Sequence, residues 1–241
     1  MESQLTHKID ELKSEFLKMG AAVEESIAEA NRALVDQDDR LAEEVIAGNA
    51  RIDDWEVAIE EEILRLLATH QPVASDLRQL AMMMKVNYDL ERINDQAVNI
   101  AERALVLNKL PLLKPLIDIP RMAEMTQRMV KDALDAFVQR NVEVARQVGR
   151  RDDDVDMLRD QIFRELLTYL KGGQPDTVDR AIHLILISRH FERIGDHASN
   201  IAENAAFLVE GRIVRHQKES WWGEGKGPPT DGVEPCARKC S

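Results

Sequence analysis

The strongest constraint on the fold of this chain is an internal repeat. Residues 91–104 have the sequence ERINDQAVNIAERA and residues 192–205 have ERIGDHASNIAENA, so ten of the fourteen positions are identical at an offset of 101. Upstream, apolar residues match at an offset of 103: Ile52, Ile59 and Ile63 correspond to Val155, Ile162 and Leu166. The change in offset means that the second copy lacks two residues, most simply in the turn around Pro72. Such a repeat predicts two copies of one supersecondary unit in tandem.

Within each copy, apolar residues recur every three or four positions, which is the period of an amphipathic helix. In the first copy this predicts one helix ending near Asp36–Asp39, a second from about Asp39 to His70, and a third that Ser75 or Asp76 caps and that runs to about Leu107. Segment 108–120 has three prolines and is predicted to link the copies. The second copy is predicted to form helices of about 121–149, 152–171 and 175–210.

These periods predict an all-α fold of two tandem, pseudo-symmetric three-helix bundles, with six long helices in total. Only 4% of the residues are aromatic and only 11 are glycine, which favours long helices over a β-sandwich or a dinucleotide-binding sheet. We therefore divide the chain into a first repeat at 1–107, a second repeat at 108–216 and a tail at 217–241. The tail is rich in glycine and proline and has no apolar period, so we expect it to be disordered.

Charge and composition exclude several classes of function. The formal net charge is −12, whereas a nucleic-acid-binding protein needs a basic face. No apolar run approaches the roughly 20 residues that span a membrane, and the N-terminal residues lack the apolar core of a secretory signal. Both cysteines, Cys236 and Cys240, are in the tail, as expected in a reducing compartment. We expect a cytoplasmic protein with no nucleic-acid partner and no membrane insertion.

The best-matched polar residues of the repeat form two acidic stripes on predicted helices. We name them the first stripe (Glu91, Asp95, Asn99 and Glu102) and the second stripe (Glu192, Asp196, Asn200 and Glu203). At 100° per residue each stripe lies on the helix face opposite the apolar residues. The preceding helix of each copy can add Asp53 and Asp156, which match at the offset of 103. Carboxylate and amide oxygens are hard ligands, so the stripes predict sites for divalent or trivalent hard metal ions such as Mn, Mg or Fe.

Other interpretations of the stripes remain open. A simple solvated helix face explains carboxylates equally well, and the protein would then be a metal-free helical scaffold. A metal-dependent enzyme, such as a phosphohydrolase that uses clustered cations, needs a pocket and a general base, neither of which is evident. A di-iron oxidase needs Glu-x-x-His motifs, and none of the six histidines follows a glutamate at that spacing. Trp221 and Trp222 either pack back on a bundle or form an exposed apolar patch.

The duplicated motif Glu-Arg-Ile-x-Asp-x-Ala-x-Asn-Ile-Ala-Glu, with Gln71-Pro72-Val73-Ala74-Ser75-Asp76-Leu77-Arg78 before its first copy, resembles the PhoU family. The resemblance covers about residues 5–212 and implies two three-helix bundles. It also implies metal clusters on Glu91/Asp95 and Glu192/Asp196. Asn94 departs from the usual glycine, which the second copy has as Gly195, and we expect little consequence.

Membership of this family would imply a non-enzymatic, cytoplasmic regulator of phosphate uptake. Such a protein couples a phosphate ABC transporter ATPase to a sensor histidine kinase and keeps the phosphate regulon repressed when phosphate is plentiful. We also expect a homodimer. Nothing in the composition or the spacing of the residues indicates phosphate. The residues themselves support a helical adaptor with acidic faces that can bind metal.

Overall fold

The structure, a computed structural model, describes residues 4–172 and 174–212 of the chain. The predicted disordered tail at 217–241 lies outside these residues. The described part contains six long α-helices and no strand: α1 Gln4–Val35, α2 Asp39–His70, α3 Ala74–Leu107, α4 Asp118–Gln139, α5 Val142–Lys171 and α6 Pro175–Glu210. The predicted all-α class and the two tandem three-helix bundles are therefore confirmed. None of the helices in the described ranges is both long enough and apolar enough to span a membrane.

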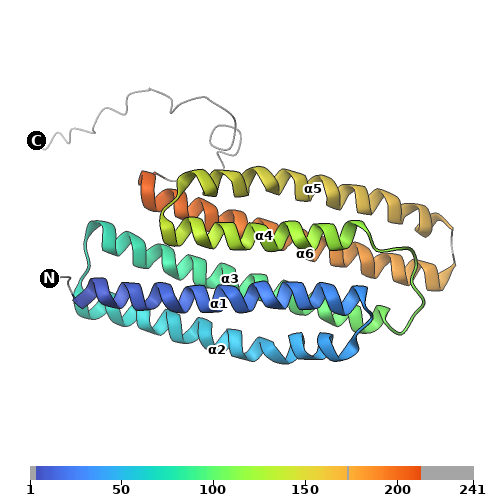
Figure 1. The fold of residues 1–241 in the computed structure, drawn as a ribbon, viewed down its shortest axis with the longest axis horizontal. Coiled ribbons are helices and arrows are strands. Elements are labelled where there is room, and N and C mark those ends of the chain that lie inside the picture. Colours follow the sequence, from blue (N-terminus) through green and yellow to red (C-terminus); the bar gives the residue numbers. More distant parts are fainter. Residues whose placement is uncertain (1–3, 173, 213–241) are drawn as a thin grey trace, which may run out of the picture.

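The two bundles lie side by side and are displaced relative to each other along their long axis (Figure 1). Helices α1, α2 and α3 pack together, as do α4, α5 and α6. Two helix pairs join the bundles, because α3 packs on α6 and α1 packs on α4. Helices α2 and α5 therefore lie at the outer edges of the assembly. The third helix of each repeat, which has the acidic stripe, is at the contact between the bundles.

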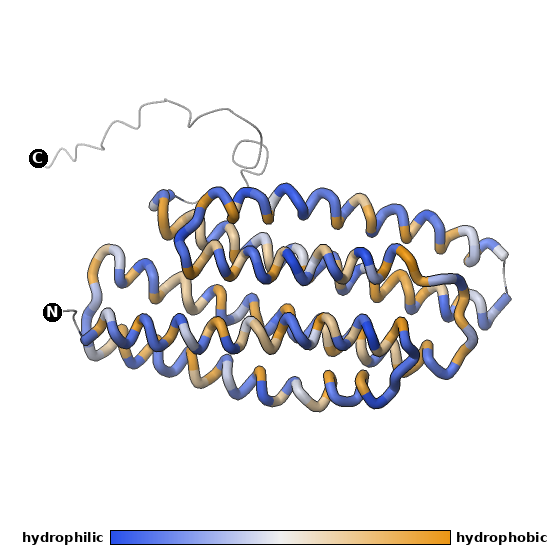
Figure 2. Tube along the Cα trace, viewed as in Figure 1, coloured by the Kyte–Doolittle hydropathy of each residue, from blue (hydrophilic) through white to orange (hydrophobic). Residues whose placement is uncertain are grey.

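One continuous apolar core runs through both bundles. Along each helix, hydrophobic and hydrophilic residues alternate with the helical period (Figure 2), and the hydrophobic ones turn inward. Phe16, Ile63, Leu80 and Phe191 are among the fully buried side chains. Burying a large apolar side chain contributes about 1.5–3 kcal/mol. This burial stabilises the long helices more than their intrinsic propensity does.

The predicted boundary between the fourth and fifth helices is wrong by about ten residues. The helices are not 121–149 and 152–171, because α4 ends at Gln139 and α5 begins at Val142. Arg140 adopts a left-handed conformation (φ 55°), and the Asn141 side chain accepts from the backbone N–H groups of Glu143 and Val144. The first copy turns in the same way at the offset of 103, with Gln37 left-handed and Asp38 as the N-cap. The repeat offset therefore contains the position of this turn, which the prediction from the apolar period missed.

Two smaller predictions about turns also need correction. Helix α3 begins at Ala74 after Val73, and no side chain caps it, so neither Ser75 nor Asp76 is the cap. The two residues missing from the second copy are not in a turn, because 71–73 and 172–174 are both three residues long. They account for the difference between α2 with 32 residues and α5 with 30. The bounds predicted for α2 and α6 are confirmed.

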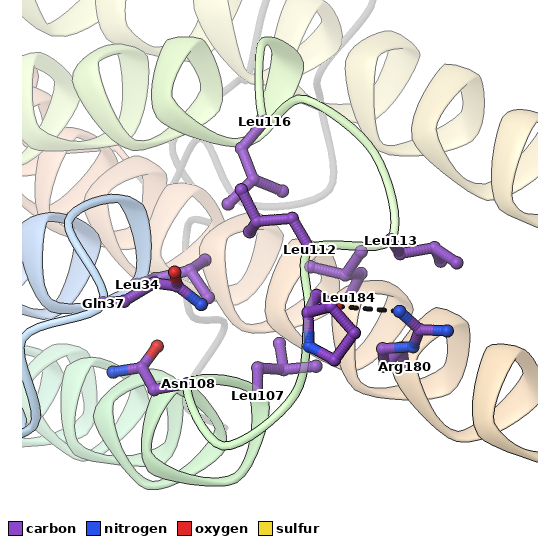
Figure 3. Close-up of a pocket in the computed structure, with 10 residues that line it drawn as sticks. Leu34, Gln37, Leu107, Asn108, Leu112, Leu113, Leu116, Arg180 and Leu184 are labelled. Carbon is purple, nitrogen blue, oxygen red and sulfur yellow. Dashed lines mark hydrogen bonds between the residues drawn. The ribbon is translucent and has the colours of Figure 1, made fainter.

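The linker between the bundles packs its leucines into the end of the molecule (Figure 3). Leu113 and Leu116 pack against the core near Leu34, Leu107 and Leu184, whereas Leu112 is exposed. The Arg180 guanidinium donates to the Pro111 carbonyl at 2.8 Å. The cavity that these residues enclose has room for about 20 Å³, which is about one water molecule. It is a packing space under the linker and is too small for a ligand.

Candidate functional site

The two acidic stripes lie on the outer faces of α3 and α6, partly covered by neighbouring helices. Glu102 and Asp196 are exposed, and the other members of both stripes, with Asp53 and Asp156, are half-buried. Helical geometry explains this placement, because the apolar residues on the opposite side of each helix are fully buried in the core. The stripes therefore lie at the surface, opposite the apolar faces, as the helical period predicts. Neighbouring helices restrict their access to water.

In the first copy, three carboxylates from two helices crowd together. The pKa of Glu91 rises from its ordinary value of 4.5 to about 7, first because of burial and then because of the nearby charges of Asp95 and Asp53. Burial and the charge of Asp95 also raise the pKa of Asp53. Arg92 compensates only in part, with its guanidinium 2.8 Å from the Asp95 carboxylate. This cluster therefore has an excess of negative charge.

Two asparagines support this cluster from within the bundle: Asn94, and Asn49, which the sequence pattern did not single out. Asn94 is buried, and its amide donates to the Asn49 side-chain oxygen at 2.8 Å. Asn49 in turn donates to the Asp53 carboxylate at 3.0 Å. Asn94 therefore connects α3, through Asn49, to Asp53 on α2. The expectation that its departure from glycine has little consequence stays a prediction. In the second copy the equivalent positions are Gly195 and Asp152.

The second copy differs because an arginine lies among its carboxylates. The Arg159 guanidinium lies 3.7 Å from Asp156, 3.3 Å from Asp160 and 3.7 Å from Glu192. At the offset of 103 the first copy has Glu56 in this position. At this one position the second copy has a cation where the first copy has an anion. The two stripes are therefore electrostatically different despite their similar sequences.

The contact between α3 and α6 contains two polar pairs related by the repeat. His197 Nδ1 lies 2.9 Å from Asp89 Oδ1, and His190 Nδ1 lies 2.9 Å from Gln96 Oε1. Exchanging the two copies converts one pair into the other, since Asp89 corresponds to His190 and Gln96 to His197 at the offset of 101. The repeat shows that Gln96 and His197 differ at equivalent positions, but the sequence does not indicate which residues they contact. These pairs connect the two bundles.

The same contact uses one predicted metal ligand and fixes the state of one histidine. Asn200 donates its amide to Asp89 Oδ1 at 3.3 Å, so this member of the second stripe takes part in joining the bundles. Burial and the neighbouring Arg103 lower the pKa of His190 to about 4, so its ring is neutral near pH 7. Arg103 donates to His190 Nε2 at 3.2 Å, which leaves Nδ1–H to donate to Gln96.

The stripes have the ligand types for a hard cation but no preformed cage. Within 4–172 and 174–212, no group of three or more His, Cys, Asp or Glu side chains is arranged to hold a metal ion. The carboxylates of the first copy fit a hard cation best, because their negative charge is incompletely compensated. Those of the second copy fit less well, because Arg159 already supplies a positive charge. Metal binding by either stripe stays a prediction.

Comparison with known proteins identifies the family. The PhoU domain model matches the chain twice, over residues 16–104 and again over 119–205, one match for each bundle. The chain belongs to the PhoU family. A phosphate-specific transport system accessory protein PhoU homolog of Aquifex aeolicus is 44% identical over 221 residues, which cover 92% of this chain and all of that protein. A homolog of the same name from Caulobacter vibrioides is 39% identical, covering 86% of this chain and 90% of that protein.

Two PhoU crystal structures have the same fold. The structure of PhoU from Pseudomonas aeruginosa is similar with a TM-score of 0.83 and 37% identity, covering 87% of this chain and all of that one. The phosphate transport system regulatory protein PhoU from Streptococcus pneumoniae is similar with a TM-score of 0.81 and 29% identity, covering 88% of this chain and 99% of that one. The similarity therefore extends over both bundles and their relative arrangement.

Proposed function

We propose that this chain is an accessory protein of a phosphate-specific transport system that regulates phosphate uptake by binding partner proteins. The observation that supports this most strongly is the family match over both bundles, with relatives of that name aligned over 90–100% of their own length. A role without catalysis agrees with the sequence, which has no Walker loop, no nucleophile elbow and no His-Glu-x-x-His motif.

The proposed partners are the ATPase of the phosphate transporter and a sensor histidine kinase, both taken from the family resemblance, in the cytoplasm. Two repeats side by side present two similar surfaces, which suits joining two partners or two subunits of a symmetric partner. The net charge of −12 favours approach to basic protein surfaces at low ionic strength. A homodimer would double the number of such surfaces and stays part of the proposal.

The proposed cation site is the first-copy cluster of Glu91, Asp95 and Asp53. Its support is the raised pKa of Glu91, because a cluster of repelling carboxylates gains most from a bound cation. A hard cation would bring positive charge to the docking surface. The second stripe would bind more weakly, since Arg159 competes with a cation for Glu192 and Asp156.

Deletion of the gene tests the proposed regulation. Expression of phosphate-starvation genes is expected to stay high in phosphate-rich medium without this protein. A variant in which Glu91, Asp95, Glu192 and Asp196 are all alanine should have the same effect while it remains folded, as judged by circular dichroism. A matched control replaces four exposed carboxylates elsewhere on the helices, such as Glu25, Glu43, Glu61 and Asp153. Normal repression in the deletion strain would contradict the proposal.

A second assay separates binding from catalysis. Purified protein is incubated with Mn²⁺ and a panel of phosphate esters, and released phosphate is measured. The proposal expects no turnover. It expects instead co-purification with the transporter ATPase or the sensor kinase. Turnover that disappears in the variant with four stripe alanines would identify a metal-dependent phosphohydrolase instead.

A further inference from the structure

The second bundle has a groove on its surface. The groove lies between α4 and α5 and has a volume of about 240 Å³. It is lined by Arg121, Met125, Asp154, Met157, Leu158 and Gln161. Met157 is 61% exposed at its edge, whereas Leu158 is buried at its base. The groove is smaller than the 300–1,000 Å³ typical of sites for drug-sized ligands, so its size suits one large side chain.

The first bundle shows what fills the equivalent position. At the offset of 103 Leu158 corresponds to Trp55, which packs half-buried between α1 and α2. The Trp55 indole N–H donates to the Glu15 carboxylate at 3.2 Å, and Lys18 pairs with the same carboxylate at 2.7 Å. An indole with an acidic acceptor beside it is thus the native occupant of this kind of groove in the first bundle.

The second bundle keeps the two charged residues beside that indole but not the indole. Glu15 corresponds to Asp118 and Lys18 to Arg121, so the acidic acceptor and the basic residue are both present. The amide of Gln161, a lining residue, donates to the Asp118 carboxylate at 3.1 Å. Met125 and Met157 replace Ala22 and Asp54, which brings two thioether side chains to the groove, and Gln161 replaces Ala58. Methionine is flexible and polarizable and packs well against aromatic rings.

We propose that this groove binds an indole from the chain's own Trp221–Trp222 pair. These are the only tryptophans besides Trp55, and they follow the last described residue, Arg212, by nine and ten positions. Nine extended residues span about 30 Å.

The nearer end of the groove lies within that distance, because the path to it is about 22 Å and the path to its farther end about 32 Å. An ion pair between Arg146 and Glu210 at 3.1 Å holds the end of α6 beside the start of α5. The groove residues Asp154–Gln161 are 8–15 positions further along α5, which is about 12–22 Å at 1.5 Å per residue. Passing around α5 adds about one helix diameter, or 10 Å. The indole takes the place that Trp55 has in the first bundle, with Asp118 as the acceptor for its N–H.

Fluorine NMR of the full chain labelled with 5-fluorotryptophan tests the proposal. Trp221→Phe and Trp222→Phe assign the two tail resonances, and a synthetic peptide of residues 213–241 supplies their free positions. One tail resonance is expected to be shifted away from its free position. Leu158→Trp places an indole in the groove from within, as in the first bundle, and should return that resonance to its free position.

Two further variants complete the experiment. Phe163→Trp adds an indole on α5 outside the groove, at a position 42% exposed, and should leave the shifted resonance in place. Met157→Asp introduces the residue that the first bundle has at the exposed edge, and should displace the tail indole without affecting folding. Two tail resonances at their free positions in the unmodified chain would overturn the proposal. A shifted resonance that neither Leu158→Trp nor Met157→Asp displaces would also overturn it.

Discussion

Replacing Glu91 by glutamine is expected to stabilise the metal-free protein above neutral pH. Glu91 is half-buried beside Asp95 and Asp53, and its pKa is raised from 4.5 to about 7. The folded state therefore holds the proton more tightly than the unfolded chain does. The stability from this proton is fully present below pH 4.5 and is lost as the pH rises through about 7. At higher pH the ionised carboxylate destabilises the fold, and glutamine removes that charge.

The size of the effect follows from the pKa and the exposure of the side chain. A change from 4.5 to about 7 corresponds to roughly 3 kcal/mol at about 1.4 kcal/mol for each pH unit. Glu91 remains open to water on one side, so screening by solvent reduces this to about 1 kcal/mol. For a chain of 241 residues, this raises the Tm by about 2–4 °C.

The measurement is thermal and urea unfolding with EDTA at a series of pH values. Glu91→Gln should unfold at higher temperature than the unmodified protein near pH 8, and the two curves should converge near pH 4.5. Glu192→Gln is the matched control in the second stripe. There Arg159 pairs with the carboxylate, so the substitution should leave the Tm unchanged or lower it slightly.

Two results would refute this reasoning. Equal Tm values for Glu91→Gln and the unmodified protein across the pH series would mean that Glu91 is not destabilised in the fold. Equal effects of Glu91→Gln and Glu192→Gln would mean that Arg159 does not distinguish the stripes. Repeating the series with Mn²⁺ in place of EDTA tests the cation site, because a ligand that binds only the folded state raises stability. The order of the Tm values should then reverse, since only the unmodified protein keeps the full set of carboxylates.

Three further substitutions test the packing and the turns by urea unfolding. Phe191→Ala should cost about 3–5 kcal/mol, because it empties a fully buried position in the core. Asp89→Ala should cost about 1–3 kcal/mol, because it removes the acceptor for His197 and Asn200 between the bundles, whereas Asp89→Asn should recover part of the loss. Asn141→Ala should cost about 1 kcal/mol, because it removes the N-cap of α5. A cost below about 0.5 kcal/mol for any of the three alanine variants would contradict the role assigned to that side chain.

Much of the fold was predictable because helices are determined by residues close in sequence. The 3.6-residue apolar period and the flanking turn residues placed α2 at Asp39–His70 and α6 at Pro175–Glu210, as the structure has them. The same period failed at the end of α4, where apolar residues continue in phase across a left-handed turn at Arg140. The repeat offset contained the missing information, because it carries the Asp38 cap of the first copy onto Asn141. Comparing the copies was more reliable there than the local period.

The candidate site was predictable only as a set of residues on helix faces. Helical geometry placed Glu91 and Asp95 on one side of α3, but only the packing of α2 against α3 brings Asp53 to them. Arg159 looks like an ordinary surface residue in the sequence, and the tertiary structure places it among the carboxylates of the second copy. The partners of Gln96 and His197 are about 100 positions away. Helix faces follow from the local chain, whereas charge balance and pKa depend on burial and on neighbours from other helices, which only the packed bundles determine.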